Sequence, residues 1–319
     1  NPPVPVGTSQ QTGLLPGQIA GIVNYTYDYI DWWHDDIGEG FAHSGLLYSH
    51  IMTPSLSIGL SDYFNMTISQ TLGIRTMDYK GDNYTPHHRD EHSSSSFLNA
   101  IGGLLGDTRF MLRYLALNDG WVGNHFFAGI GFVMPSKNRL TKSPFEYTLD
   151  EDGNKVFDEH RHFSMSEGTY QWMIDLQYYK KSTPPIIFWG VSSSISHPFK
   201  ESPEGFLSPT RINLTFNLLT QKIKLLNASL GLTLAYEYSG DSKWNGEIAP
   251  NSKGEVFSPG LGLTWKSKNQ LEYSLNLLFP QSLTGDLAEI ESKPDQTLKS
   301  FQFSFGIRKT FDYTIPFLE

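Results

Sequence analysis

Apolar and polar residues alternate along most of this chain with a period of two, and this pattern constrains the fold more than any other feature. From 212 to 218 every even-numbered residue is apolar and every odd-numbered residue is polar, and segments 228–236, 271–279 and 301–308 repeat the pattern. Successive side chains of a β-strand point to opposite faces, so each segment has one apolar and one polar face. The sequence therefore predicts an all-β protein, and no amphipathic helix of ordinary length competes.

Weaker copies of the alternation bring the number of predicted strands to about twelve. They are expected at 19–33, 43–60, 64–79, 106–117, 121–134, 168–181, 186–197, 209–220, 224–238, 256–267, 269–280 and 298–311. The connections alternate between short turns and long loops, and the long loops are expected at 34–42, 80–105, 135–167, 198–208, 239–255 and 281–297. Every second connection then lies at the same end of the sheet, which is typical of outer-membrane barrels with short periplasmic turns and long extracellular loops.

The composition agrees with such a barrel. No apolar run approaches the roughly 18 residues of a membrane helix, and the mean hydropathy of −0.33 is typical of strands that average an apolar and a polar face. Aromatic residues make up 14% of the chain and gather near strand ends, where they predict two interface belts. Tyr25, Tyr27, Tyr29, Trp32 and Trp33 would lie toward the long loops, and Trp121, Tyr178, Tyr179, Trp189 and Trp265 toward the short turns.

We therefore expect one antiparallel transmembrane β-barrel over residues 19–311 in a bacterial outer membrane. Residues 1–18 would form a flexible periplasmic segment and residues 312–319 a C-terminal tail. The chain begins at Asn1 without a basic-then-apolar leader, and we expect a form from which a signal peptide has been removed. A soluble secreted β-protein remains an alternative.

The expected partners follow from that location. They are the lipid bilayer, lipopolysaccharide and a small-molecule substrate. The net charge of −9 argues against a nucleic-acid partner, which normally requires a basic patch. A protein partner at the loops or at the periplasmic end stays open.

The polar strand faces would line the lumen of the barrel. The predicted lumen-lining residues with ionisable side chains are Asp28, Arg75, Arg109, Arg113, His125, Asp175, Arg211, Glu237, Glu272 and Arg308. Buried charges need partners, so these residues could form a structural ion-pair network that holds the wall in shape. They could also line a wetted path with a cationic stripe of Arg109, Arg113, Arg211 and Arg308. The two roles do not exclude each other.

Histidines in two of the predicted long loops suggest a metal site. Imidazole is an ordinary ligand for zinc, copper or iron-group ions, and the candidate ligands are His87, His88, His92, His160 and His162. A site needs three or four ligands that converge at about 2 Å, which loop spacing alone does not show. Solvated polar loops explain the same residues. No phosphate-binding glycine loop or dinucleotide fingerprint is present, and we expect no cofactor.

Catalysis by a Ser–His pair has two local candidates on a strand, His43–Ser44 and Ser49–His50. A hydroxyl nucleophile must meet the imidazole that activates it. Neighbours on a strand point to opposite faces, so neither pair can meet directly. We expect no enzyme.

Two segments resemble a known family. Residues 106–114 read Gly-Asp-Thr-Arg-Phe-Met-Leu-Arg-Tyr and residues 129–136 read Gly-Ile-Gly-Phe-Val-Met-Pro-Ser. They are similar to the outer-membrane proteins of the meta-pathway of phenol degradation, which have a Gly-Asp-Thr strand start and a Gly-rich strand ending in Leu-Pro-Thr-Gly before a long loop. In this chain 134–137 read Met-Pro-Ser-Lys. Gly168-Thr169-Tyr170 also fits, and the resemblance runs loosely over most of 19–311.

The resemblance implies an outer-membrane barrel that passes small, often aromatic or hydrophobic, compounds, and it brings no catalytic residues. We therefore expect a channel or transporter for small molecules that works by passive diffusion through a polar lumen. The alternative is a structural barrel with a closed lumen, whose loops bind a partner or a metal.

Overall fold

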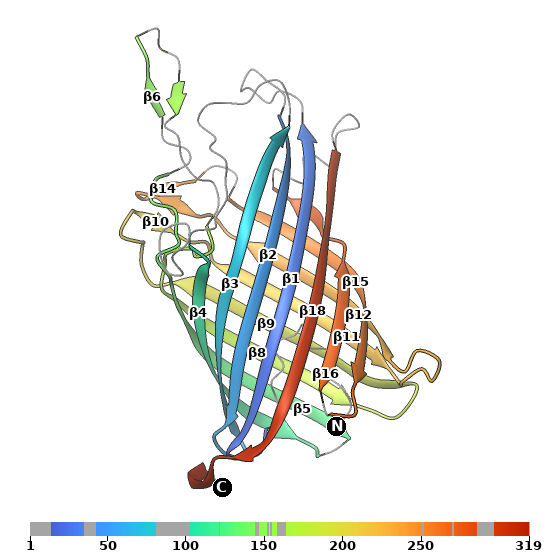
Figure 1. Ribbon diagram of the computed structural model, residues 1–319. Helices are drawn as coiled ribbons and strands as arrows, with labels where there is room; N and C mark the ends of the chain where they lie inside the picture. Colours follow the sequence, from blue (N-terminus) through green and yellow to red (C-terminus); the bar gives the residue numbers. More distant parts are fainter. Residues whose placement is uncertain are drawn as a thin grey trace.

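The computed structural model describes residues 14–34, 43–80, 103–120, 122–143, 147–151, 153, 155–157, 164–249, 252–269, 271–285 and 297–318. Twelve strands of this part of the chain form one antiparallel ring in sequence order (Figure 1). The pairing of β1 with β18 closes the ring between the two ends of the chain. The strands are β1 (Gln18–His34), β2 (His43–Gly59), β3 (Phe64–Lys80), β4 (Leu105–Asn118), β5 (Gly123–Met134), β8 (Gln171–Lys181), β9 (Ile186–Pro198), β11 (Arg211–Thr220), β12 (Ser229–Ser239), β15 (Gly254–Lys266), β16 (Glu272–Leu278) and β18 (Thr297–Thr314).

The predicted all-β barrel is therefore confirmed, as is the alternation of short and long connections. Most strand boundaries agree within a few residues. The largest difference is at β12, which begins at Ser229 and not at 224. Ile223 donates its N–H to the carbonyl of Ala228 at 2.8 Å, and Asn227 has a φ of 53°, so this stretch forms a turn.

Shorter elements lie in the long connections. β6 (Tyr147–Leu149) and β7 (Lys155–Phe157) form a hairpin between β5 and β8. β10 (Phe206–Leu207), β13 (Lys243–Trp244) and β14 (Glu247–Ile248) form a small sheet that joins two loops. β17 (Gln281–Thr284) pairs with β15, and the 3-10 turn η1 (Pro316–Leu318) follows β18.

Apolar side chains are exposed and polar side chains are buried, which is the reverse of the arrangement in a soluble protein. Large apolar side chains such as Ile130 and Leu261 are 67% and 66% exposed on the outer face, whereas the fully buried side chains include Asn217 and Ser274. An apolar outer wall around a polar interior is what a barrel needs in a lipid bilayer. Among the described residues, no helix has the length and apolar character needed to cross a membrane.

Outward-facing aromatic side chains gather at two levels of the wall. Near the short turns Tyr178 lies 5.4 Å from Trp189 between ring centroids. Toward the long loops Tyr29 lies 5.2 Å from Phe301. The prediction for Tyr179 was wrong, because this residue follows outward-facing Tyr178 and is buried on the inner face. Interface belts of this kind hold a barrel at its depth in the bilayer.

Candidate functional site

The inner face near the long loops carries a mixed charge cluster. Arg75 on β3, Arg109 on β4 and Arg211 on β11 all interact electrostatically with the Asp107 carboxylate. Asp107 was not among the predicted lumen-lining residues, although it has the same parity on β4 as Arg109 and alternation could have found it.

Two further predicted carboxylates lie at this level. Glu237 on β12 interacts with Arg211, and Asp28 on β1 accepts a hydrogen bond from Gln302 at 2.7 Å and interacts with Arg75. The three arginines near the mouth therefore face carboxylates from several strands.

A short segment of the loop between β5 and β8 folds into this mouth. The carbonyl of Ser164 accepts a hydrogen bond from Arg75 at 3.0 Å, and Glu167 forms an ion pair with Arg211. β3 and β11 lie five places apart in a ring of twelve strands, so these two arginines come from nearly opposite walls. The segment 164–167 contacts both arginines and therefore lies inside the mouth, which it narrows.

Halfway down the barrel, Arg113 and Asp175 form a buried ion pair. Arg113 Nε lies 2.7 Å from Asp175 Oδ1, and both side chains are 3% exposed. The two residues sit on β4 and β8, and Gly129 of β5 lies between them in register. A Cβ on Gly129 would lie 3.0 Å from the Cγ of Arg113, so the glycine leaves room for the arginine to cross β5. Gln177 adds a hydrogen bond to Asp175 at 2.9 Å.

The predicted lumen-lining residues near the short turns also form ion pairs or pack against other side chains. Glu272 and Arg308 face each other in register on β16 and β18, and Arg308 Nη1 lies 3.0 Å from Glu272 Oε2. His125 stacks on Tyr179 at 4.7 Å between ring centroids. Of the proposed cationic stripe, Arg113, Arg211 and Arg308 thus belong to ion pairs, and Arg109 is exposed to the lumen.

The middle of the barrel encloses a cavity of about 470 Å³. Its lining comes from ten strands and consists mostly of small polar side chains: ten serines and threonines and four asparagines and glutamines. Arg109, Arg113 and Asp175 are the charged residues that line it. The cavity can therefore hydrogen-bond a solute from all sides and carries little net charge.

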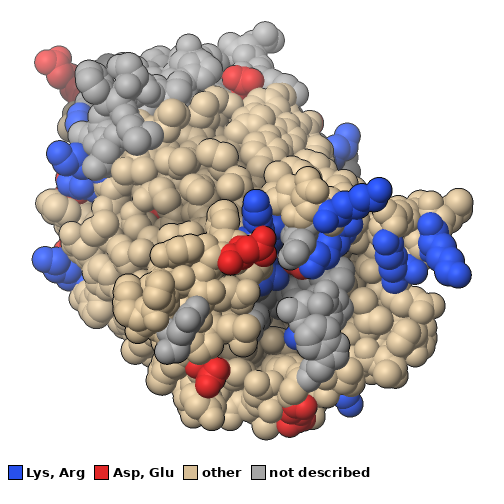
Figure 2. Space-filling model, turned by 60° about the horizontal axis from the view of Figure 1, so that its bottom comes forward, with Lys and Arg blue, Asp and Glu red and all other residues tan. Residues whose placement is uncertain are grey.

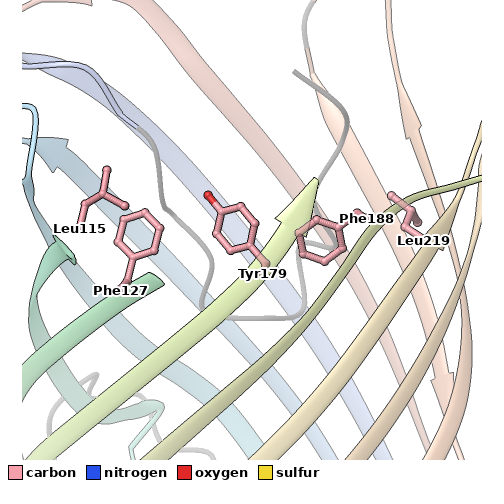
Figure 3. Packing of buried hydrophobic residues seen from close by; sticks show 5 residues of the cluster. All are labelled: Leu115, Phe127, Tyr179, Phe188 and Leu219. Atoms are coloured by element: carbon pink, nitrogen blue, oxygen red, sulfur yellow. The ribbon is translucent and has the colours of Figure 1, made fainter. Parts of the chain in front are cut away.

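Five apolar side chains form a row on the inner face near the short turns, as Figure 3 shows. They are Leu115, Phe127, Tyr179, Phe188 and Leu219, one from each of β4, β5, β8, β9 and β11. The rings of Tyr179 and Phe188 lie 5.5 Å apart. Sequence reasoning missed this row, because it assigned polar character to the whole inner face.

Contacts between long loops form a connected cap. Arg139 makes a bidentate ion pair with Glu204, at 2.7 and 2.8 Å, and so joins the loop after β5 to the loop after β9. This hydrogen bonding lowers the pKa of the Glu204 carboxyl below its ordinary value and raises the pKa of Arg139. The ring of Phe206, in the loop after β9, packs on the ring of Trp244 at 5.0 Å between centroids and so joins the loop after β12 to the cap.

The opposite end of the barrel is rich in cations. Figure 2 shows Lys and Arg side chains around a hollow on the face that carries the short turns. Lysines at or beside these turns include Lys181, Lys222, Lys224, Lys266 and Lys268.

The predicted metal ligands His87, His88, His92, His160 and His162 lie outside the described residues. Within the described ranges, no group of three or more His, Asp or Glu side chains could hold a metal ion. His50 faces outward and hydrogen-bonds Tyr25 at 2.8 Å, whereas neighbouring Ser49 is buried on the inner face. The two side chains of that candidate pair therefore point apart.

Sequence comparisons with models of protein families and with curated proteins find no match. Comparison with solved structures finds the COG4313 outer membrane channel from Pseudomonas putida F1, with a TM-score of 0.63 and 12% identity over 96% of this chain and 100% of that one. The translocator domain of the autotransporter NalP from Neisseria meningitidis has a TM-score of 0.43 and 8% identity over 95% of this chain and 90% of that one. The CymD monoaromatic hydrocarbon channel also has a TM-score of 0.43, with 7% identity over 94% of this chain and 90% of that one. The likeness to the COG4313 structure, together with the closed ring of twelve strands, shows that this protein has the fold of a bacterial outer-membrane β-barrel.

Proposed function

We propose that this protein is a channel through which small molecules diffuse passively across the outer membrane. The observation that carries the proposal is the polar cavity of about 470 Å³, lined by the inner faces of ten strands. A barrel of twelve strands encloses more space than a packed barrel of eight strands and less than a porin of sixteen. The description of the COG4313 structure as a channel and the resemblance to the phenol-degradation family support passage of small molecules.

Charged residues lie at two levels along the transport path, the mouth and the cavity. The segment 164–167 narrows the mouth, where Arg75 and Arg211 hold it. Below it, Arg109 and the Arg113–Asp175 pair face the cavity. A solute that passes the mouth would thus enter a space walled by hydroxyl and amide groups.

Osmotic swelling of proteoliposomes tests this proposal. Vesicles that contain the purified protein should swell in an isosmotic solution of a small permeant solute such as arabinose, and the rate should fall as the solute becomes larger. Swelling at the rate of protein-free vesicles for every solute would overturn the proposal. Vesicles with a heat-denatured sample provide the matched control.

A closed structural barrel that binds a partner is the second candidate. The observation that favours it is the row of buried apolar side chains from Leu115 to Leu219, which lines the inner wall near the short turns. A row of this kind narrows a water-filled path. Complete absence of swelling, together with a correctly folded barrel, would favour this function over the channel.

A further inference from the structure

The pairing between β16 and β18 ends partway up the wall of the barrel. Its last pair is Leu278 with Gln302, and β18 continues toward the long loops beyond the end of β16 (Figure 1). Past this pair, β17 pairs with β15, and residues 297–301 of β18 pair with β1.

The two sides of this seam, β17 and residues 297–301 of β18, lie apart. Among the described residues, no backbone hydrogen bond joins β17 to β18. Few of their Cα atoms come within 8 Å of each other, although neighbouring strands of a sheet lie about 5 Å apart. The described part of the wall is therefore split at the seam.

Pro280, between β16 and β17, adapts the backbone to an open edge. Phe279 donates its N–H to the carbonyl of Pro259 on β15 at 2.9 Å. Successive backbone groups of a strand point to opposite sides, so the backbone of Pro280 faces β18. Proline has no N–H to satisfy, and the Pro280 carbonyl accepts a hydrogen bond from the Ser300 hydroxyl at 2.9 Å. Polar backbone groups without partners are costly in lipid, and this position avoids that cost.

The seam begins at the wall of the central cavity. Leu278 and Gln302, the last pair below the seam, both line the cavity. Gln302 also donates to the Asp28 carboxylate on β1 at 2.7 Å, which holds its side chain on the lumen side. A solute that enters through the seam would therefore reach the cavity directly.

The outer side of the seam faces lipid. Leu277 and Phe279 have the same parity along the chain, and both are exposed, so the wall is apolar up to the seam on the β16 side. On the β18 side, Phe301 belongs to the outward aromatic belt with Tyr29. The seam therefore opens at the level of this belt, in the half of the bilayer nearer the long loops.

The cavity offers apolar contacts as well as polar ones. Its apolar lining residues come from five strands and are Ile22, Met111, Met173, Ala235 and Leu278. A small, largely apolar solute dissolves in the bilayer and can pack against these side chains. A strongly polar solute would have to leave water before it could cross the seam, which is costly.

We propose that the seam between β17 and residues 297–301 of β18 is a lateral portal, through which small apolar solutes pass between the bilayer and the cavity. This inference rests on the proposed channel function and adds a route to it. Solutes that partition into the membrane thus enter or leave the lumen through the wall, without passing the mouth that the segment 164–167 narrows.

Photolabelling from the bilayer tests the portal. In proteoliposomes, the lipid-soluble reagent 3-trifluoromethyl-3-phenyldiazirine should label Met111 and Met173 inside the cavity on illumination, as mass spectrometry of the digested protein measures. The chain contains no cysteine, so Ser282→Cys/Leu298→Cys can be bridged across the seam with a flexible bis-maleimide. Bridging should remove most of the label from both methionines. Label on outward-facing Ile130 should not change, which confirms equal access to the lipid-facing wall.

Ile30→Cys/Leu47→Cys is the matched control. These residues face each other across the paired strands β1 and β2, and Ile30 lies in register with Ser300, so the bridge closes no gap at the same level. It should leave the label on both methionines unchanged. Absence of label on Met111 and Met173, or label that the seam bridge does not reduce, would overturn the portal. Photolabelling needs no flow of solute, so its outcome is separate from the swelling assay on which the channel function depends.

Discussion

Replacing Arg109 by glutamate should shift the ion preference of the lumen strongly toward cations. Arg109 is exposed to the lumen and lines the cavity, whereas Arg113 beside it is neutralised by Asp175. A sphere with the cavity's volume of 470 Å³ has a radius of about 5 Å, which we take as the distance between a passing ion and the side-chain charge. The charge at position 109 therefore acts on every ion that crosses the cavity.

The size of the effect follows from this distance. Two unit charges about 5 Å apart in water interact by about 0.8 kcal/mol, and screening at about 0.15 M salt reduces this to about 0.45 kcal/mol. Removing a positive charge and adding a negative one changes the energy of K⁺ and of Cl⁻ by about 0.9 kcal/mol each, in opposite directions. The permeability ratio of K⁺ to Cl⁻ should thus rise about twentyfold. At about 1 M salt the same reasoning gives only about threefold.

The reversal potential of single channels under a KCl gradient measures this ratio. Arg109→Gln should give about half the free-energy change, and Lys224→Glu at an exposed turn should leave the ratio near the wild-type value. An unchanged reversal potential in Arg109→Glu, with current still present, would refute the assignment of Arg109 to the ion path. A shift that does not depend on salt would refute the electrostatic reasoning.

Three further predictions concern the ion pairs. Arg113→Ala should destabilise the barrel by about 3–5 kcal/mol because Asp175 is left buried without its partner. The double variant Arg113→Met/Asp175→Leu should recover much of that lost stability. The urea dependence of heat-modifiable gel migration measures the stability of both variants. Glu167→Gln should weaken the contact with Arg211 and widen the mouth, which would appear as faster proteoliposome swelling with large solutes, and unchanged size dependence would count against the narrowing. The folded-state pKa of Glu204 is lowered, so its ion pair stabilises the loop cap above the unfolded pKa and is lost as the pH falls through the folded pKa. Limited proteolysis of the loops should therefore increase in that acidic range for the wild type, and Glu204→Gln should show the increase already at neutral pH.

The barrel could be predicted because the bilayer imposes a local pattern. A strand between lipid and lumen must alternate, and segments such as 212–218 do so without exception. The strand pairs that close the ring then follow from sequence order. The position of Tyr179 was predicted wrongly from its residue type. An aromatic residue near a strand end is typical of an interface belt, but Tyr179 alternates with outward-facing Tyr178 and is buried on the inner face.

Contacts between distant strands could not be predicted in this way. The Arg113–Asp175 pair depends on the register of β4, β5 and β8 and on the missing side chain at Gly129. The inward course of the segment 164–167 depends on two arginines from nearly opposite walls. Such loop geometry leaves no periodic signal in the sequence.

The measurement that tests the central claim most directly is the single-channel conductance of the purified protein in planar bilayers. A passive channel predicts discrete, reproducible current steps whose size increases with salt concentration. A folded, heat-modifiable barrel that inserts into the bilayer but gives no steps at any voltage or salt concentration would contradict the account.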